Sequence, residues 1–183
     1  MSVISLTSKQ KGIFSIEFAI VGVIFSLLFV FSGDVISKLS FKGKLDRLSF
    51  SMVNILKERT QLYSDDYAIT QEQVDLLVDI SSQSLGRTIR SFDSASFGYV
   101  FESVTFDSDN NPTLTSFSQS GSGISCTVGS SLLSYQNLSK VTTWNRQTSL
   151  YRVTFCYNTD NWIGDLLGRE FRRVQSDAVM IGR

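Results

Sequence analysis

The feature that most constrains the fold is an almost unbroken apolar run near the start of the chain. From Ile13 to Phe31 the sequence reads IFSIEFAIVGVIFSLLFVF. A helix needs about 20 apolar residues to cross a hydrocarbon core of about 30 Å. This run, with its flanking residues, is therefore just long enough to span a bilayer.

The charges around the run predict its orientation. Lys9 and Lys11 precede it, and no charge follows it until Asp34. Positive residues next to a membrane segment stay on the cytoplasmic side, so the N-terminus is expected in the cytoplasm. The sequence thus predicts a transmembrane segment over residues 13–33 and an extracytoplasmic domain over residues 34–183.

One acidic residue, Glu17, interrupts the apolar run. A carboxylate in a membrane helix costs about 2.5–3.5 kcal/mol near the centre, and less near an end where it can reach the interface. One interpretation is a glutamate that snorkels to the cytoplasmic surface. The other is cleavage after Gly12, which gives Ile13 a mostly cationic α-amino group. Four helical residues rise about 6 Å, so a neighbouring copy shifted by that distance would bring its amino group beside Glu17.

The segment KGIFSIEFAIVG resembles the prepilin-peptidase site of the TadE/TadF minor pseudopilins of the tight-adherence (Flp-type) pilus system. The hallmark of that family is a Gly-x-x-x-x-Glu-Phe run, which Gly12, Glu17 and Phe18 match here. The resemblance implies that residues 1–12 form a cytoplasmic leader and that Ile13 begins the mature chain. It also implies that Glu17 takes part in recognition and assembly. The paired cysteines and the segment SFGYVFESVTF favour TadF over TadE.

Cys126 and Cys156 are the chain's two cysteines, and both lie in its β-like half. In an oxidising compartment such a pair predicts one disulfide, and two buried thiols in a cytosolic domain are the alternative.

The composition offers little for catalysis or nucleic-acid binding. Seventeen basic and seventeen acidic residues cancel, and the chain has no histidine, the commonest general base and metal ligand. We therefore expect no enzyme activity, no cofactor and no nucleic-acid partner. Asp107, Asp109 and Asn111 match the first three ligand positions of a calcium loop. However, proline and serine stand where that loop requires glycine and glutamate, so a hairpin turn is expected.

The pattern predicts an α+β fold: a long spine helix, a second helix and a small, mainly antiparallel sheet. The first helix is expected from Ile13 to about Tyr63, with a break near Ser32–Gly33 as the alternative. The second begins with a capping box at Thr70 and Gln73 and ends at Gly86 or at Ser91–Phe92. Strands are expected from Phe97, with a bulge near Glu102–Ser103, and over residues 113–117, 124–128, 151–157 and 177–181.

The resemblance implies a minor pilin that helps to initiate, cap or build a pilus fibre, and so supports adherence and biofilm formation. The expected partners are other pilin subunits, the membrane prepilin peptidase, the inner-membrane assembly platform and the lipid bilayer. One alternative is an uncleaved bitopic inner-membrane protein whose periplasmic domain binds a ligand or partner. Another is a secreted hydrolase behind an ordinary signal peptide.

Overall fold

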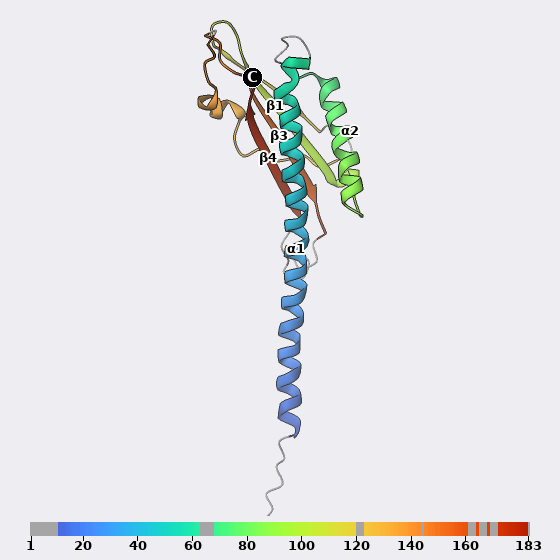
Figure 1. The fold of residues 1–183 in the computed structure, drawn as a ribbon. Coiled ribbons are helices and arrows are strands. Elements are labelled where there is room, and N and C mark those ends of the chain that lie inside the picture. The colour runs from blue at the N-terminus through green and yellow to red at the C-terminus, as the bar shows by residue number, and fades with distance from the viewer. Residues whose placement is uncertain are drawn as a thin grey trace, which may run out of the picture.

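The structure, a computed structural model, consists of a long helix that protrudes from a small α+β head (Figure 1). It describes residues 11–62, 68–119, 123–143, 145–160 and 172–182, together with Gly164 and Gly168. The helices are α1 (Lys11–Leu62) and α2 (Gln71–Thr88), with short 3-10 turns η1 (Ser94–Ser96) and η2 (Leu132–Leu138). The strands are β1 (Phe97–Phe106), β2 (Pro112–Ser118), β3 (Leu150–Asn158) and β4 (Arg173–Ile181). The predicted α+β class is confirmed.

Helix α1 runs for 52 residues without interruption. Gly33 and Gly43 lie within it, so the alternative of two helices broken near Ser32–Gly33 is wrong. The chain's single proline, Pro112, lies elsewhere, and α1 is rich in residues that a helix accommodates. The predicted end at Tyr63 lies outside the described residues, one position beyond the observed end at Leu62.

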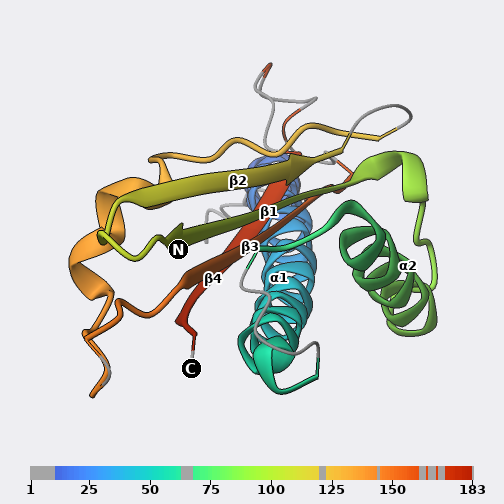
Figure 2. The ribbon, with the colours of Figure 1, turned by 90° about the horizontal axis from the view of Figure 1, so that it is seen from above.

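Four antiparallel strands form one sheet in the order β2-β1-β3-β4. Helices α1 and α2 lie on the same face of this sheet (Figure 2). The main core fills the space between them. From α1 it takes Leu45, Leu48, Met52, Val53 and Leu56, and from the sheet Phe97, Phe101, Val153, Phe155 and Tyr157.

The opposite face of the sheet is covered as well, by the segment that leads from residue 123 through η2. Val104, Leu132 and Leu150 form a second apolar cluster there. Beside it, Glu102 and Arg152 make a buried ion pair across β1 and β3, and Arg152 Nη2 donates to the Ser130 carbonyl at 2.8 Å. Strands β1 and β3 are thus buried on both faces.

This burial explains why the predicted bulge at Glu102–Ser103 is wrong. Strand β1 pairs in unbroken register with β2 and β3, including the pairs Glu102↔Ser116 and Ser103↔Thr115. The large apolar side chains of β1 switch from one face of the strand to the other without a bulge, because each face packs against its own apolar cluster. A strand buried on both sides need not alternate apolar and polar residues.

The predicted strand at residues 124–128 is also wrong, because this segment joins no ladder. It crosses the sheet and is held by the disulfide between Cys126 and Cys156 and by the side chain of Gln175. Gln175 Nε2 donates to the Thr127 carbonyl at 2.7 Å. The crossing is close: a Cβ atom on Gly98 would lie 2.0 Å from the carbonyl oxygen of Ile124.

The predicted capping box begins α2. The Thr70 N–H donates to Gln73 Oε1 at 3.3 Å, which satisfies one of the free donors at the helix start. The helix ends at Thr88, two residues after the predicted Gly86. Its buried stripe is Val74, Leu77, Ser81 and Leu85, with Val78 partly buried.

We predict that Gly98→Ala destabilises the head by about 1–3 kcal/mol, as overpacking does elsewhere. The added methyl group would meet backbone at 2.0 Å, and backbone cannot move aside as a flexible side chain can. Gly129→Ala is the matched control, because nothing lies within 4 Å of its added Cβ. Urea unfolding followed by circular dichroism measures both variants. Equal midpoints for the two would contradict the close crossing.

Candidate membrane-anchoring and assembly site

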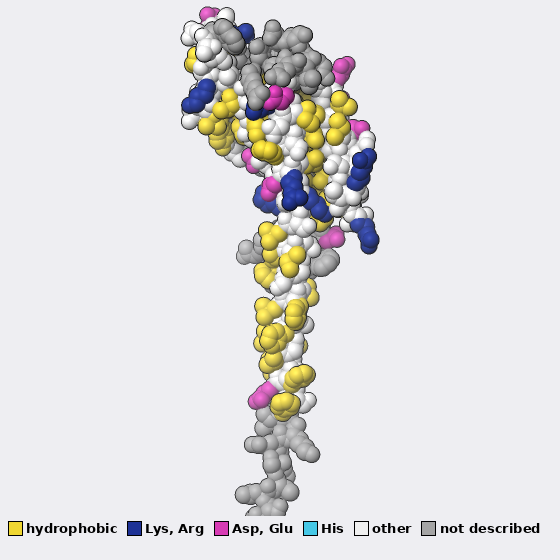
Figure 3. Space-filling view, in the orientation of Figure 1, with side chains coloured by type: hydrophobic (Ala, Val, Ile, Leu, Met, Phe, Trp, Pro, Cys, Tyr) yellow, Lys and Arg dark blue, Asp and Glu magenta, His cyan; other side chains and the backbone are white. Residues whose placement is uncertain are grey.

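The first half of α1 is exposed on every side. All side chains from Phe14 to Ser32 are exposed, and most are apolar (Figure 3). Thirteen of them are large: Phe14, Ile16, Phe18, Ile20, Val21, Val23, Ile24, Phe25, Leu27, Leu28, Phe29, Val30 and Phe31. Burying one such side chain contributes about 1.5–3 kcal/mol, so burying all thirteen would contribute about 20–40 kcal/mol. That exceeds the 5–15 kcal/mol that stabilises a typical domain, so water is a poor solvent for this half.

Two serine hydroxyls on this half suit an apolar environment. Ser26 Oγ donates to the Val23 carbonyl, and Ser32 Oγ donates to the Leu28 carbonyl, each at 2.8 Å. Both hydroxyls therefore find their hydrogen-bond partner within the helix, as a lipid-facing hydroxyl requires. Within the described residues, α1 is the one helix long and apolar enough to cross a membrane.

The predicted processing and assembly residues lie together at the start of α1. Gly12 and Ile13 already have helical backbone, in the first turn, and Glu17 and Phe18 follow one turn later. Glu17 is exposed, and the rings of Phe14 and Phe18 stack beside it with centroids 6.5 Å apart. The rise from residue 13 to residue 17 is about 6 Å. The site thus combines one carboxylate with an apolar surface on all sides.

Asp34, the first charged residue after the apolar half, is the first buried side chain of α1 from Phe14 onward, and the core proper begins later, at Leu45. Asp34 is 8% exposed and pairs with Lys38 at 2.5 Å, one helical turn later. The pair was missed in the sequence, although the spacing of an acidic residue four positions before a lysine is a known signal for it. The ion pair marks the point at which α1 first meets the head.

Several polar contacts fix the second half of α1 on the head. Ser49 and Ser176 hydroxyls lie 3.2 Å apart in the core, and Ser176 also bonds to Asp46. Lys44 Nζ donates to the Thr88 carbonyl at the end of α2, at 2.8 Å. Each contact joins residues far apart in the sequence, so no local pattern predicts it.

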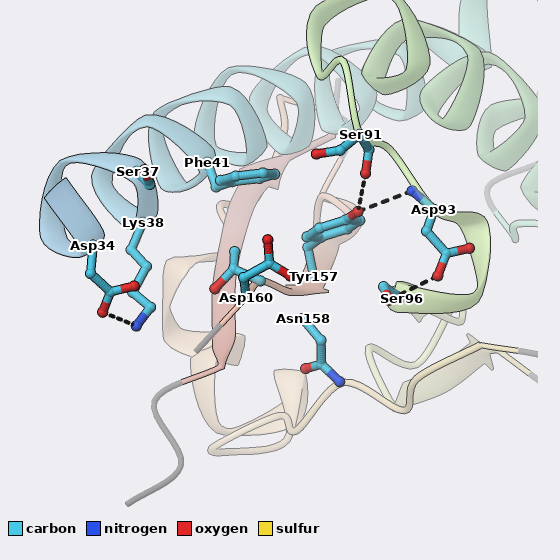
Figure 4. A pocket seen from close by; sticks show the side chains of 11 residues that line it. Asp34, Ser37, Lys38, Phe41, Ser91, Asp93, Ser96, Tyr157, Asn158 and Asp160 are labelled. Atoms are coloured by element: carbon cyan, nitrogen blue, oxygen red, sulfur yellow. Dashed lines mark hydrogen bonds and ion pairs between the residues drawn. The ribbon is translucent and has the colours of Figure 1, made fainter. Parts of the chain in front are cut away.

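A polar pocket of about 320 Å³ opens where α1 enters the head (Figure 4). Phe41 of α1 stacks on Tyr157 of β3 with centroids 5.3 Å apart. The Tyr157 hydroxyl accepts from the Asp93 N–H at 3.0 Å and donates to the Ser91 carbonyl at 3.3 Å. These contacts tie α1, β3 and the loop before η1 together. The contacts around the pocket therefore fix the angle at which the apolar half of α1 leaves the head.

The head holds the remaining predicted site, the disulfide. Cys126 and Cys156 are joined, with Cα atoms 5.6 Å apart, on the sheet face opposite α1. It closes a loop between residues 30 positions apart, which is worth about 3–4 kcal/mol in the chain-entropy model. This site is structural and lies on the head, whereas Gly12, Ile13 and Glu17 lie on the protruding half of α1.

The turn at Asp107 is the predicted hairpin turn between β1 and β2. Asp107 Oδ1 accepts from the backbone N–H groups of Asp109 and Asn111, at 2.9 and 2.8 Å. Asp107 Oδ2 accepts from the Asn111 side-chain amide at 3.0 Å. These bonds, above all the one from the Asn111 side chain, lower the pKa of the Asp107 carboxyl. Among the described residues, no cluster of three or more acidic, histidine or cysteine side chains could hold a metal ion.

The comparison with protein families identifies the family of this chain. The family model of the tight adherence pilin protein F, TadF, matches residues 5–183. The chain belongs to the TadF family. Membership confirms the predicted TadE/TadF resemblance and the preference for TadF, and it gives the chain a pilin-like role in a Tad pilus. Comparison with curated proteins and with solved structures gives no match.

Family membership also fits the geometry of α1. A long apolar N-terminal helix on a small head suits the membrane anchor of a pilin. Pilins work together with other pilus components, so the exposed apolar half of this TadF-family chain is its candidate surface for both lipid and neighbouring subunits.

We predict that the Asp107 carboxyl titrates below the ordinary aspartate value of about 3.9. Its pKa is lowered on folding, so its contribution to stability is complete above that value and is lost as the pH falls through the lowered pKa. An NMR titration of the side-chain carboxyl carbon measures it. Asn111→Ala removes the main cause and should move the pKa back up. An unchanged pKa in that variant would contradict the assignment.

Proposed function

We propose that this TadF-family chain is a minor pilin that takes part in assembling a Flp/Tad-type pilus after cleavage between Gly12 and Ile13. It then initiates, caps or joins the fibre, and so supports adherence and biofilm formation. The role is structural, and no catalytic step is assigned to the chain. Residues 1–12 act as the leader, residues 13–33 as the membrane segment and residues 34–183 as the extracytoplasmic domain.

The observation that carries this proposal is the position of Glu17 on a helix half that the head leaves uncovered. A lone carboxylate among apolar side chains loses much of its hydration, and a cation nearby recovers part of that loss. Cleavage after Gly12 creates such a cation on Ile13. The two groups are one helical turn apart, so an axial shift of about 6 Å between copies pairs them.

The same pairing gives the assembly a defined register. Apolar helix surfaces alone can slide past one another, because most offsets bury similar areas. A single ion pair in an apolar surrounding favours one offset over the others. We infer that Glu17 selects the register in which the α1 helices of neighbouring subunits pack.

Localisation follows from the same helix. Lys9 and Lys11 keep the N-terminus in the cytoplasm, and the head lies in the periplasm. The disulfide between Cys126 and Cys156 supports this topology, because disulfides persist in oxidising compartments such as the periplasm. The peptidase and the inner-membrane platform then meet the chain from within the membrane, and the other pilin subunits meet it laterally.

We predict that Glu17→Ala and Glu17→Gln each remove the subunit from the pilus fraction while leaving its level in the membrane unchanged. Both variants remove the negative charge, and Glu17→Gln keeps the side-chain shape. The measurement is immunoblotting of sheared pili and of membranes from a host that lacks the native copy, together with pilus counts by electron microscopy.

Ser26→Ala is the matched control, because the Ser26 hydroxyl bonds only within its own helix. It should behave as the unaltered protein does. Normal incorporation of the Glu17→Ala variant would contradict the register argument and would favour the alternative of a bitopic protein with a partner-binding periplasmic domain.

A further inference from the structure

A groove of about 450 Å³ runs between α1 and the start of β4, next to the point where the apolar half begins. We call it the neck groove. Its apolar floor is formed by Val35, Leu39 and Val174, and Gln175 also contributes to its lining. Three cations line it as well, namely Lys38, Lys42 and Arg173.

The position of the neck groove relative to a bilayer follows from helix geometry and rests on the proposed membrane topology. Residues 14–33 rise about 30 Å, which fills the hydrocarbon core. Val35 and Leu39 then lie about 3–9 Å beyond the end of that segment. The headgroup layer on each side of the core is about 5–8 Å thick. The floor of the groove is thus placed at the level of the outer-leaflet headgroups.

The floor leaves apolar surface uncovered. Leu39 is 64% exposed, and Val35 is 37% exposed. Neither residue is needed to hold α1 on the head, where the core begins at Leu45. Apolar side chains in a groove at this level contact the glycerol and upper acyl carbons of a lipid.

Lys38 pairs with Asp34 at 2.5 Å, so the positive charge that a ligand can use comes from Lys42 and Arg173. Arg173 Nη1 donates to the Thr127 hydroxyl at 2.9 Å, and a neutral hydroxyl does not cancel the charge of the guanidinium. Lys42 Nζ shares its contacts between Asp46, at 3.2 Å, and the Gln175 carbonyl, at 3.1 Å. Figure 3 shows Lys and Arg side chains gathered where the apolar half meets the head.

We propose that the neck groove binds one anionic phospholipid of the outer leaflet of the inner membrane. Its phosphate lies between Lys42 and Arg173, and its glycerol and first acyl carbons lie on Val35 and Leu39. A zwitterionic lipid offers the same phosphate but carries a headgroup cation that Lys42 and Arg173 repel. The groove therefore prefers a lipid with net negative charge, and each lysine or arginine near the surface favours it about fivefold.

The test uses the full chain in nanodiscs that contain equal amounts of phosphatidylglycerol and phosphatidylcholine. Native mass spectrometry after release from the nanodisc measures which lipid stays bound. We expect one retained lipid, mainly phosphatidylglycerol. The double variant Lys42→Gln/Arg173→Gln should reduce this preference about 25-fold, which is about fivefold for each removed cation.

Lys140→Gln is the matched control. Lys140 is an exposed lysine that follows η2, outside the neck groove, so its replacement removes one positive charge, as each substitution of the double variant does, without touching the lipid. The preference of this variant for phosphatidylglycerol should equal that of the unaltered chain. Equal retention of both lipids by the unaltered chain, or the same loss in the control and the double variant, would overturn the proposal.

A separate measurement distinguishes failure of the groove from failure of the membrane topology. Flotation of the full chain with vesicles of phosphatidylcholine alone tests insertion of α1 without any headgroup preference. Co-flotation combined with equal lipid retention contradicts the neck groove only. Failure to float contradicts the membrane segment on which the proposal rests.

Discussion

Helix α1 lies in two environments, and the rest of the structure depends on that division. From Phe14 to Ser32 its side chains are exposed, and from Leu45 to Leu56 the helix contributes to the core of the head. Burying the thirteen large apolar side chains of the first half would contribute more free energy than the free energy of unfolding of a typical small domain. The described part of the head covers none of them. Lipid or neighbouring copies must therefore cover this surface, as a pilin-like role in a Tad pilus requires.

The head holds the other half of α1 at a fixed angle. One face of the sheet packs against Leu45, Met52 and Val53 of the helix. The opposite face is closed by the segment that the disulfide ties to Cys156. Because both faces are covered, the central strands β1 and β3 are buried along most of their length. The hydrogen bond between Ser176 and Ser49 and the stacking of Tyr157 on Phe41 then fix where α1 crosses the sheet and where it leaves the head.

The sequence correctly predicted the helices and strands that are determined by residues close together in the chain. The capping box at Thr70 and the alternation around Cys156 each depend on residues close in sequence, and both gave the right element. The errors arose where a distant segment decides the structure. The supposed strand at residues 124–128 reflects the crossing over Gly98, and the supposed bulge in β1 reflects the second apolar layer around Leu132. The ion pair of Glu102 with Arg152 joins residues 50 positions apart, and no spacing rule reveals it. In the proposed assembly site, Gly12, Glu17 and Phe18 could be named from the sequence because they form one contiguous motif.

The central claim is that the exposed half of α1 becomes an assembly surface when cleavage places an α-amino group one turn from Glu17. The most direct measurement is the N-terminal sequence of the protein taken from membranes of its native host, where the matching peptidase is present. The account predicts a chain that begins at Ile13. A chain that begins at Met1 would leave Glu17 without its cationic partner and would contradict the account.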